Sequence, residues 1–190
     1  MTETTITKKK AKPGSGKSKG GGFEREVASK LSLWFSEGER DDIFYRSHSS
    51  GGRFTMRRKT SRDTAYQSGD ITCSDPIGKG LINSWSIECK TGYGKWDVLD
   101  MLDSNQKVTQ IEAFFKQCQE DAFKCSKHPV LIFRRNGRKV CICIGKEYFS
   151  HLKDLFGEYE DIHLLVYGNS LVIMKFDDFL NWADPSQFKG

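Results

Sequence analysis

The sequence lacks any long apolar run, and this absence excludes a membrane-spanning helix. None of its apolar runs approaches the roughly 20 residues that cross a bilayer, and its first residues contain no apolar segment like that of a secretory signal. Its six cysteines form no Cys-x-x-Cys pair, and its four histidines are not spaced like zinc ligands. We therefore expect free thiols, no membrane partner and a cytoplasmic location in a bacterial, archaeal or phage-infected host cell, or a nuclear one where the host has a nucleus.

Acidic residues are scarce in two stretches, and this scarcity concentrates the positive charge. The net charge is +5, and residues 1–19 carry six lysines against one acid. A second cluster contains no acid between residues 51 and 62, and its basic members are Arg53, Arg57, Arg58, Lys59 and Arg62. The rest of the chain is net acidic. This pattern favours a polyanionic partner, above all nucleic acid, although a solubilising tail and a solvated loop would give it too. No aromatic signature of RNA binding is present, which favours DNA.

Hydrophobic periodicity predicts one domain of the α/β class. We expect a disordered basic arm over residues 1–19, a core over 20–146, and a C-terminal α+β addition over 147–190 that packs on the core. The predicted helices cover 23–36, 105–124, 148–156 and 176–182, and the predicted strands cover 43–45, 70–73, 85–90, 130–133, 139–144, 164–167 and 171–174. Residues 74–80 look like a turn and 136–137 like a hairpin.

Three charged residues suggest a catalytic centre. Asp70 lies in one apolar run, and Glu88 and Lys90 end another. Side chains alternate along a strand, so Glu88 and Lys90 share a face. Two carboxylates can hold Mg²⁺, which prefers oxygen ligands, and an ammonium can orient water or stabilise developing charge. The alternative is a solvated ion pair on a strand and an aspartate in a turn.

Motifs elsewhere in the chain extend this pattern, and together they resemble the PD-(D/E)XK nuclease superfamily. The similarity is closer to archaeal-type Holliday junction resolvases and their phage relatives. The matching segments, in chain order, are Lys19-Gly20, Glu24-Arg25-Glu26, Arg46-Ser47 with the small residues after it, Gly69-Asp70-Ile71, Ile87-Glu88-Cys89-Lys90, and Gln110 with Phe114. The resemblance covers residues 19–144 and implies a restriction-endonuclease-like α-β-β-β-α-β core, with a mixed sheet flanked by helices.

The resemblance also implies roles for individual residues. Glu24, Asp70 and Glu88 would be metal ligands for Mg²⁺, with Mn²⁺ able to substitute, and Lys90 would serve the attacking water. Ser47, or alternatively Ser49 or Ser50, would lie near the scissile phosphate. The residues that we expect to contact DNA are Lys17, Lys19, Arg25, Arg46, Ser49, Arg53, Arg57, Arg58, Lys59, Arg62 and Gln110.

The sequence departs from the resolvase pattern in three places. Gly69 stands where proline or valine is usual, and the segments before Asp70 and between Asp70 and Glu88 are longer than in compact resolvases. The segment after Ile144 has no counterpart. These departures are compatible with a catalytic role, but they leave the preference for junctions open.

The sequence therefore predicts a metal-dependent DNA endonuclease that leaves 5′-phosphates. Its substrate would be a Holliday junction, in recombination or repair, cut by the paired nicks of a homodimer. One alternative is a restriction- or repair-type enzyme that cuts duplex DNA. Another is a non-catalytic DNA-binding accessory protein on the same fold. A basic RNA-binding protein is a further alternative that the sequence favours least.

Overall fold

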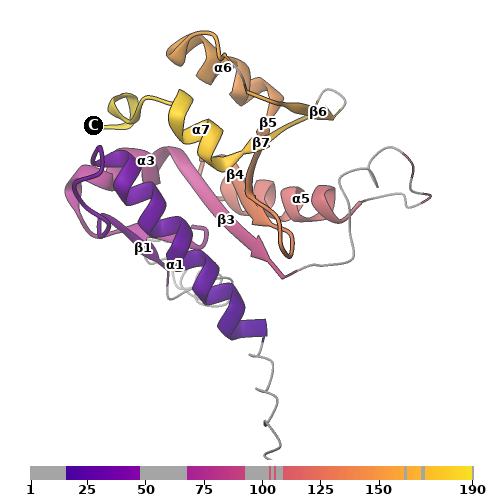
Figure 1. The fold of residues 1–190 in the computed structure, drawn as a ribbon, viewed down its shortest axis with the longest axis horizontal. Coiled ribbons are helices and arrows are strands. Elements are labelled where there is room, and N and C mark those ends of the chain that lie inside the picture. Colours follow the sequence, from indigo (N-terminus) through magenta and orange to yellow (C-terminus); the bar gives the residue numbers. More distant parts are fainter. Residues whose placement is uncertain are drawn as a thin grey trace, which may run out of the picture.

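A computed structural model describes residues 16–47, 68–92, 103, 105, 109–160, 162–167 and 170–189, with only the backbone at 16–19 and 167. Its centre is a mixed five-stranded sheet in the order β3-β4-β5-β7-β6 (Figure 1). The strands are β3 (Trp85–Thr91), β4 (His128–Arg134), β5 (Val140–Gly145), β6 (Leu165–Tyr167) and β7 (Leu171–Lys175). β3 and β4 run parallel, and the other neighbours run antiparallel. The predicted fold class is confirmed.

Helices cover both faces of the sheet. The helices are α1 (Gly16–Phe35), α3 (Lys79–Ser84), α5 (Gln110–Phe123), α6 (Lys146–Phe156) and α7 (Phe176–Trp182). Phe23 of α1 and Phe179 of α7 belong to one buried cluster with Ile87 of β3. Ile111 of α5 packs in a second cluster with Leu131 of β4. The sheet therefore separates two cores. In the described part of the chain, no helix is both long and apolar enough to span a membrane.

Helix α1 begins earlier than the sequence predicts. Gly16 rather than Phe23 is its first residue, so residues 16–19, assigned to the arm, are helical. Glycine is a poor helix former, which is why the three glycines at 20–22 argue against a helix. A tertiary contact overrides that preference, because the Arg46 guanidinium lies against Gly21, where a Cβ would come within 2.9 Å of Nη1.

Helix α5 begins later than predicted. Its first residue is Gln110 rather than a residue near Asn105. Thr109 and Glu112 form a capping box, in which the Thr109 amide donates to Glu112 Oε2 at 2.7 Å. This box satisfies amide groups that the first turn leaves without partners, and it therefore defines the start.

Two short strands connect α1 to the edge of the sheet. β1 (Phe44–Arg46) and β2 (Ile71–Cys73) pair antiparallel, with Arg46 opposite Ile71. Gly69, just before β2, forms a parallel bridge with Ile87 of β3. The predicted turn at 74–80 is partly wrong, because a 3₁₀ turn η2 (Pro76–Gly78) leads directly into α3.

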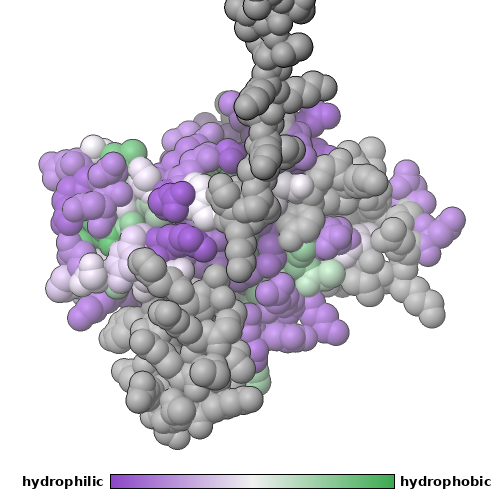
Figure 2. Space-filling view, turned by 90° about the horizontal axis from the view of Figure 1, so that it is seen from below, coloured by the Kyte–Doolittle hydropathy of each residue, from purple (hydrophilic) through white to green (hydrophobic). Residues whose placement is uncertain are grey.

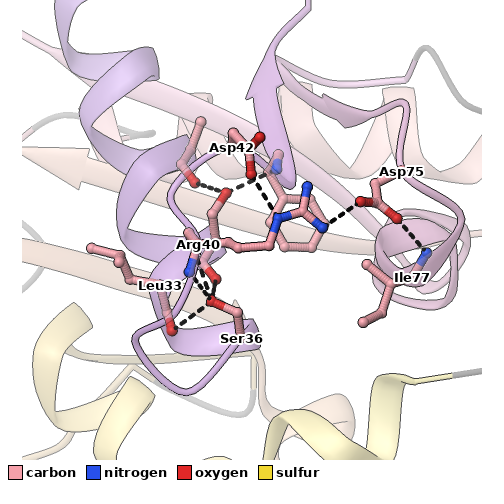
Figure 3. A network of polar contacts seen from close by, with 9 residues as sticks. Leu33, Ser36, Arg40, Asp42, Asp75 and Ile77 are labelled. Carbon is pink, nitrogen blue, oxygen red and sulfur yellow. Dashed lines mark hydrogen bonds and ion pairs between the residues drawn. The ribbon is translucent and has the colours of Figure 1, made fainter.

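An ion-pair network holds these strands to the end of α1 (Figure 3). Arg40 Nε donates to Asp42 at 2.9 Å, and Arg40 Nη1 donates to Asp75 at 2.7 Å. The other Asp75 oxygen accepts from the Ile77 amide at 3.1 Å. The network joins the segment before β1 to the segment after β2, and so it restrains the pair of strands that ends in Arg46 and begins directly after Asp70.

The C-terminal segment extends the central sheet. β7 pairs with β5, and β6 pairs with β7. A closing 3₁₀ turn, η3 (Pro185–Phe188), places Phe188 edge-on to Trp85 of β3, with ring centroids 5.0 Å apart. The six cysteines are free, as predicted, and four of them are buried.

Candidate active site

Backbone hydrogen bonds fix Asp70 at the edge of β3. Its amide donates to the Ile87 carbonyl at 2.7 Å, and its carbonyl accepts from the Ser47 amide at 2.7 Å. Its side-chain Oδ2 accepts from the Cys89 amide at 2.9 Å. The Asp70 carboxylate therefore binds the strand at the residue between Glu88 and Lys90, and it is only 5% exposed.

Glu88 and Lys90 share the face of β3 that looks toward α5. Ile87 and Cys89 belong to the core on the α1 side, so the strand alternates as the sequence predicts. Lys90 Nζ lies 2.6 Å from Glu88 Oε1 and 5.6 Å from the centroid of the Phe114 ring on α5. Both side chains are mostly buried. Water is thus largely excluded around the pair, which strengthens its electrostatic interactions.

Gly69 explains one departure from the resolvase pattern. Its φ is +83°, and a Cβ built there would lie 2.5 Å from the Ile87 carbonyl oxygen. Residues with side chains rarely adopt this φ, and no real Cβ comes so close to a backbone oxygen. Glycine thus allows the backbone before Asp70 to lie directly against β3, where proline or valine would collide with it.

Burial and neighbouring negative charge make Asp70 hard to ionise. Burial raises its pKa most, and the Glu88 carboxylate raises it further, to about 7. The Glu24 carboxylate adds to the rise, whereas the Cys89 amide and the Lys90 ammonium oppose it. Three carboxylates therefore influence one another at this edge of the sheet.

The donor set suits a hard divalent cation, although it is not assembled as a three-ligand site. Oxygen donors and surplus negative charge are what Mg²⁺ requires. Among the residues that the structure describes, however, no three acidic, histidine or cysteine side chains are grouped closely enough to hold a metal. Glu24 instead forms a short ion pair with Arg46 Nε. Cation binding by Asp70 and Glu88 therefore stays a prediction.

The structure locates some of the other predicted residues. Ser47 is buried beside Asp70, as its amide contact shows. Arg25 is exposed on α1, and Gln110 is exposed one helical turn before Phe114. Lys17 and Lys19 lie in α1, where only their backbone is described. The predictions that lie outside the described residues concern Ser49, Ser50, Arg53, Arg57, Arg58, Lys59 and Arg62.

Sequence reasoning missed the partner of Glu26. Arg134 Nη1 donates to both Glu26 oxygens at 2.8 Å, and its guanidinium lies 4.8 Å from the centroid of the Phe23 ring. Glu24 thus binds Arg46 of β1, and Glu26 binds Arg134 of β4. The signal in the sequence was the basic run from Arg134 to Lys139 around the predicted hairpin.

Replacement of Asp70 by asparagine should stabilise the metal-free protein, and more so as pH rises. The folded pKa of about 7 lies above the ordinary value of 3.8, so the folded chain keeps a proton that the unfolded chain releases. Stability is therefore lost as pH rises between these values. We expect Asp70→Asn to raise the free energy of unfolding in EDTA by about 2–4 kcal/mol at pH 8 and by clearly less at pH 4.5.

Urea unfolding at the two pH values measures this difference. The exposed Asp41→Asn is the matched control, and it should change stability little at either pH. An Asp70→Asn effect that is the same at pH 4.5 and pH 8 would show that the Asp70 pKa is not raised.

Comparisons with known proteins assign the chain to a family. No curated protein sequence and no solved structure matches it. One family model, described as "Phage putative PDDEXK endonuclease", matches residues 15–190, which include every element described above. The Asp70, Glu88 and Lys90 set at the edge of the sheet is the set of residue types that the family's name denotes. The chain therefore belongs to the phage PD-(D/E)XK endonuclease family.

Proposed function

We propose that this protein is a divalent-metal-dependent DNA endonuclease that resolves branched DNA by paired nicks. Asp70, Glu88 and Lys90 form the proposed active centre. Asp70 and Glu88 would hold Mg²⁺ or Mn²⁺, with Glu24 as a further carboxylate. When bound, the cation would polarise the phosphodiester and acidify a water molecule.

One contact carries the proposal that Asp70, Glu88 and Lys90 form an active centre. The Cys89 amide donates to Asp70 Oδ2 at 2.9 Å, which joins residues 19 positions apart and brings the aspartate to Glu88 and Lys90. A solvated ion pair on a strand needs no such neighbour, and an aspartate in a turn would not be 5% exposed. The arrangement thus favours the catalytic interpretation over the structural one.

The side chains have separate tasks in the proposed reaction. Lys90 Nζ carries N–H donors beside Glu88, where it can orient the attacking water and stabilise negative charge on the phosphate. Asp70 must lose its proton to hold a cation, and its raised pKa means that this occurs near neutral pH. Burial of all three side chains strengthens these interactions.

The preference for branched DNA rests on the resemblance to resolvases. Glu24-Arg25-Glu26 lies on the helix α1 and Ser47 follows the strand β1, which supports that resemblance. Two symmetric nicks require two active centres, so we propose that the protein acts as a homodimer.

Cleavage of a labelled four-way junction, beside a duplex of the same sequence, tests the proposal. We expect symmetric nicks with 5′-phosphates in the junction with Mg²⁺ and none with EDTA. Equal cutting of junction and duplex would remove the junction preference and favour a duplex endonuclease. Tight binding without cutting in Mg²⁺ or Mn²⁺ would contradict the enzyme and favour the accessory protein.

Removal of the basic arm should weaken DNA binding in a salt-dependent manner. Because α1 begins at Gly16, the deletion should remove residues 1–15 and spare the helix. Four lysines lie in that segment, so the slope of log K against log salt should fall by about three to four units if each meets a phosphate.

Fluorescence anisotropy with labelled duplex, at several salt concentrations without divalent metal, measures the slope. A full-length variant with Lys8, Lys9, Lys10 and Lys12 changed to glutamine is the matched control, and it should behave like the deletion. An unchanged slope in both variants would mean that the arm does not contact DNA.

A further inference from the structure

A groove lies where the catalytic strand ends. It is lined by α1, by the end of β3 and by the β4–β5 hairpin, and its volume is about 550 Å³. The lining residues are Gly22, Phe23, Thr91, Gly92, Arg134, Arg135, Asn136 and Gly137. These three elements meet at one end of the sheet (Figure 1). The sequence-based list of DNA contacts includes none of these residues.

Strand register places the groove next to the proposed active centre. In the parallel pairing of β3 with β4, Lys90 lies opposite Phe133 and Thr91 lies opposite Arg134. Thr91 directly follows Lys90, so the groove begins where the catalytic strand ends. Lys90 faces α5, whereas the groove opens on the α1 side of the strand. A polymeric substrate held at the active centre would reach the groove by passing over this end of β3.

The hairpin side of the groove is cationic. Residues 134–139 contain Arg134, Arg135, Arg138 and Lys139 and no acid. Arg138 and Lys139 are exposed, and the Arg138 amide donates to the Arg135 carbonyl at 3.0 Å, so the turn keeps the two arginines close in space. Guanidinium groups match the oxygens of a phosphate better than any other side chain.

Two side chains of α1 hold the Arg134 guanidinium in position. Both oxygens of Glu26 accept from Nη1, and the Phe23 ring packs against the guanidinium. A guanidinium carries five N–H donors, and the side-chain hydrogen bonds of Arg134 to other described residues use only Nη1. Its other donors can therefore meet an anion without breaking the pair with Glu26.

Glycines keep the groove open. A Cβ atom built at Gly22, Gly92 or Gly137 would meet no atom of the described residues within 4 Å. A sugar–phosphate backbone could thus approach the main chain closely. The coloured surface in the view from below is mostly hydrophilic, with smaller hydrophobic patches (Figure 2).

We propose that this groove binds the sugar–phosphate backbone of the DNA strand next to the scissile phosphate. The inference rests on the proposed function, since it takes DNA as the substrate. Arg134 and Arg135 would contact the phosphates in the groove, and Arg138 would contact the backbone at its rim. These contacts do not read bases, so the groove strengthens binding to all sequences alike.

Binding and cutting by an Arg135→Ala/Arg138→Ala variant of the full chain test the groove. With fluorescein-labelled duplex and no divalent metal, we expect binding about tenfold weaker and a salt slope smaller by about two units. With Mg²⁺ and DNA well below saturation, cleavage should fall by a similar factor, because less DNA is bound. Arg135→Lys/Arg138→Lys should recover most of the salt slope, since it keeps both charges.

Lys124→Ala, which removes an exposed charge at the end of α5, is the matched control and should leave binding unchanged. Thermal unfolding checks that every variant folds. If the wild type binds and cuts DNA while the double variant matches its affinity and salt slope, the groove inference alone is wrong. If the wild type neither binds nor cuts DNA, the proposed function is wrong, and so is the groove inference that depends on it.

Discussion

Asp70→Asn is expected to reduce DNA cleavage by about three orders of magnitude or more, on the scale of single transition-state interactions. The change removes the charge that would hold the cation with Glu88. It keeps the shape of the side chain, whose amide oxygen can still accept from the Cys89 amide. DNA binding should change less than about threefold, because repulsion between a carboxylate and phosphates is relieved rather than increased.

Two assays separate these effects. Single-turnover cleavage of labelled junction and duplex with Mg²⁺ gives the chemical rate, and anisotropy in EDTA gives the affinity. Asp41→Asn, on the surface after α1, is the control and should cut like the wild type. If Asp70→Asn cuts at the wild-type rate, the proposed centre lies elsewhere. If it loses binding and cutting together, Asp70 supports the fold instead.

Gly69→Ala should both destabilise the protein and impair cleavage. The left-handed backbone and the overlap with Ile87 each carry a cost, so we expect the free energy of unfolding to fall by about 3 kcal/mol or more. The backbone before Asp70 would have to move away from β3. That movement would lengthen the contact of Asp70 with the Cys89 amide, and cleavage should fall at least about tenfold.

Replacement of a second glycine separates the cost of the Cβ overlap with Ile87 from the cost of a positive φ. Gly157 has the same φ of +83°, but a Cβ there would meet no atom of the described residues within 4 Å. Gly157→Ala should therefore carry only the backbone cost, about 1–3 kcal/mol, and leave cleavage unchanged. Urea unfolding and single-turnover cleavage of both variants measure the difference. Equal losses for Gly69→Ala and Gly157→Ala would contradict the close approach of Gly69 to β3.

Local patterns predicted much of the fold because they depend on neighbouring residues. The alternation around Glu88 and Lys90 follows from the period of a strand, and the apolar stripe of α5 follows from the period of a helix. The capping box at Thr109 and Glu112 was also readable, and it would have corrected the start of α5.

Contacts between distant segments could not be predicted in this way. The start of α1 depends on Arg46 packing against Gly21, and the position of Asp70 depends on the bridge between Gly69 and Ile87. The groove depends on the register that sets Thr91 beside Arg134. None of these contacts leaves a periodic signal in the sequence. The residue types and spacing suggested the grouping of Asp70 with Glu88 and Lys90, and the resemblance to nucleases supported it. The contact of Asp70 with the Cys89 amide gives the grouping a physical basis.

Calorimetric titration of Mn²⁺ tests, without depending on activity, whether Asp70 and Glu88 share a divalent cation as proposed. The wild type should bind Mn²⁺, and Glu88→Gln should bind it at least about tenfold more weakly. Glu147→Gln, exposed on α6, should bind as the wild type does. Equal Mn²⁺ affinity in the wild type and Glu88→Gln would contradict the proposed metal centre.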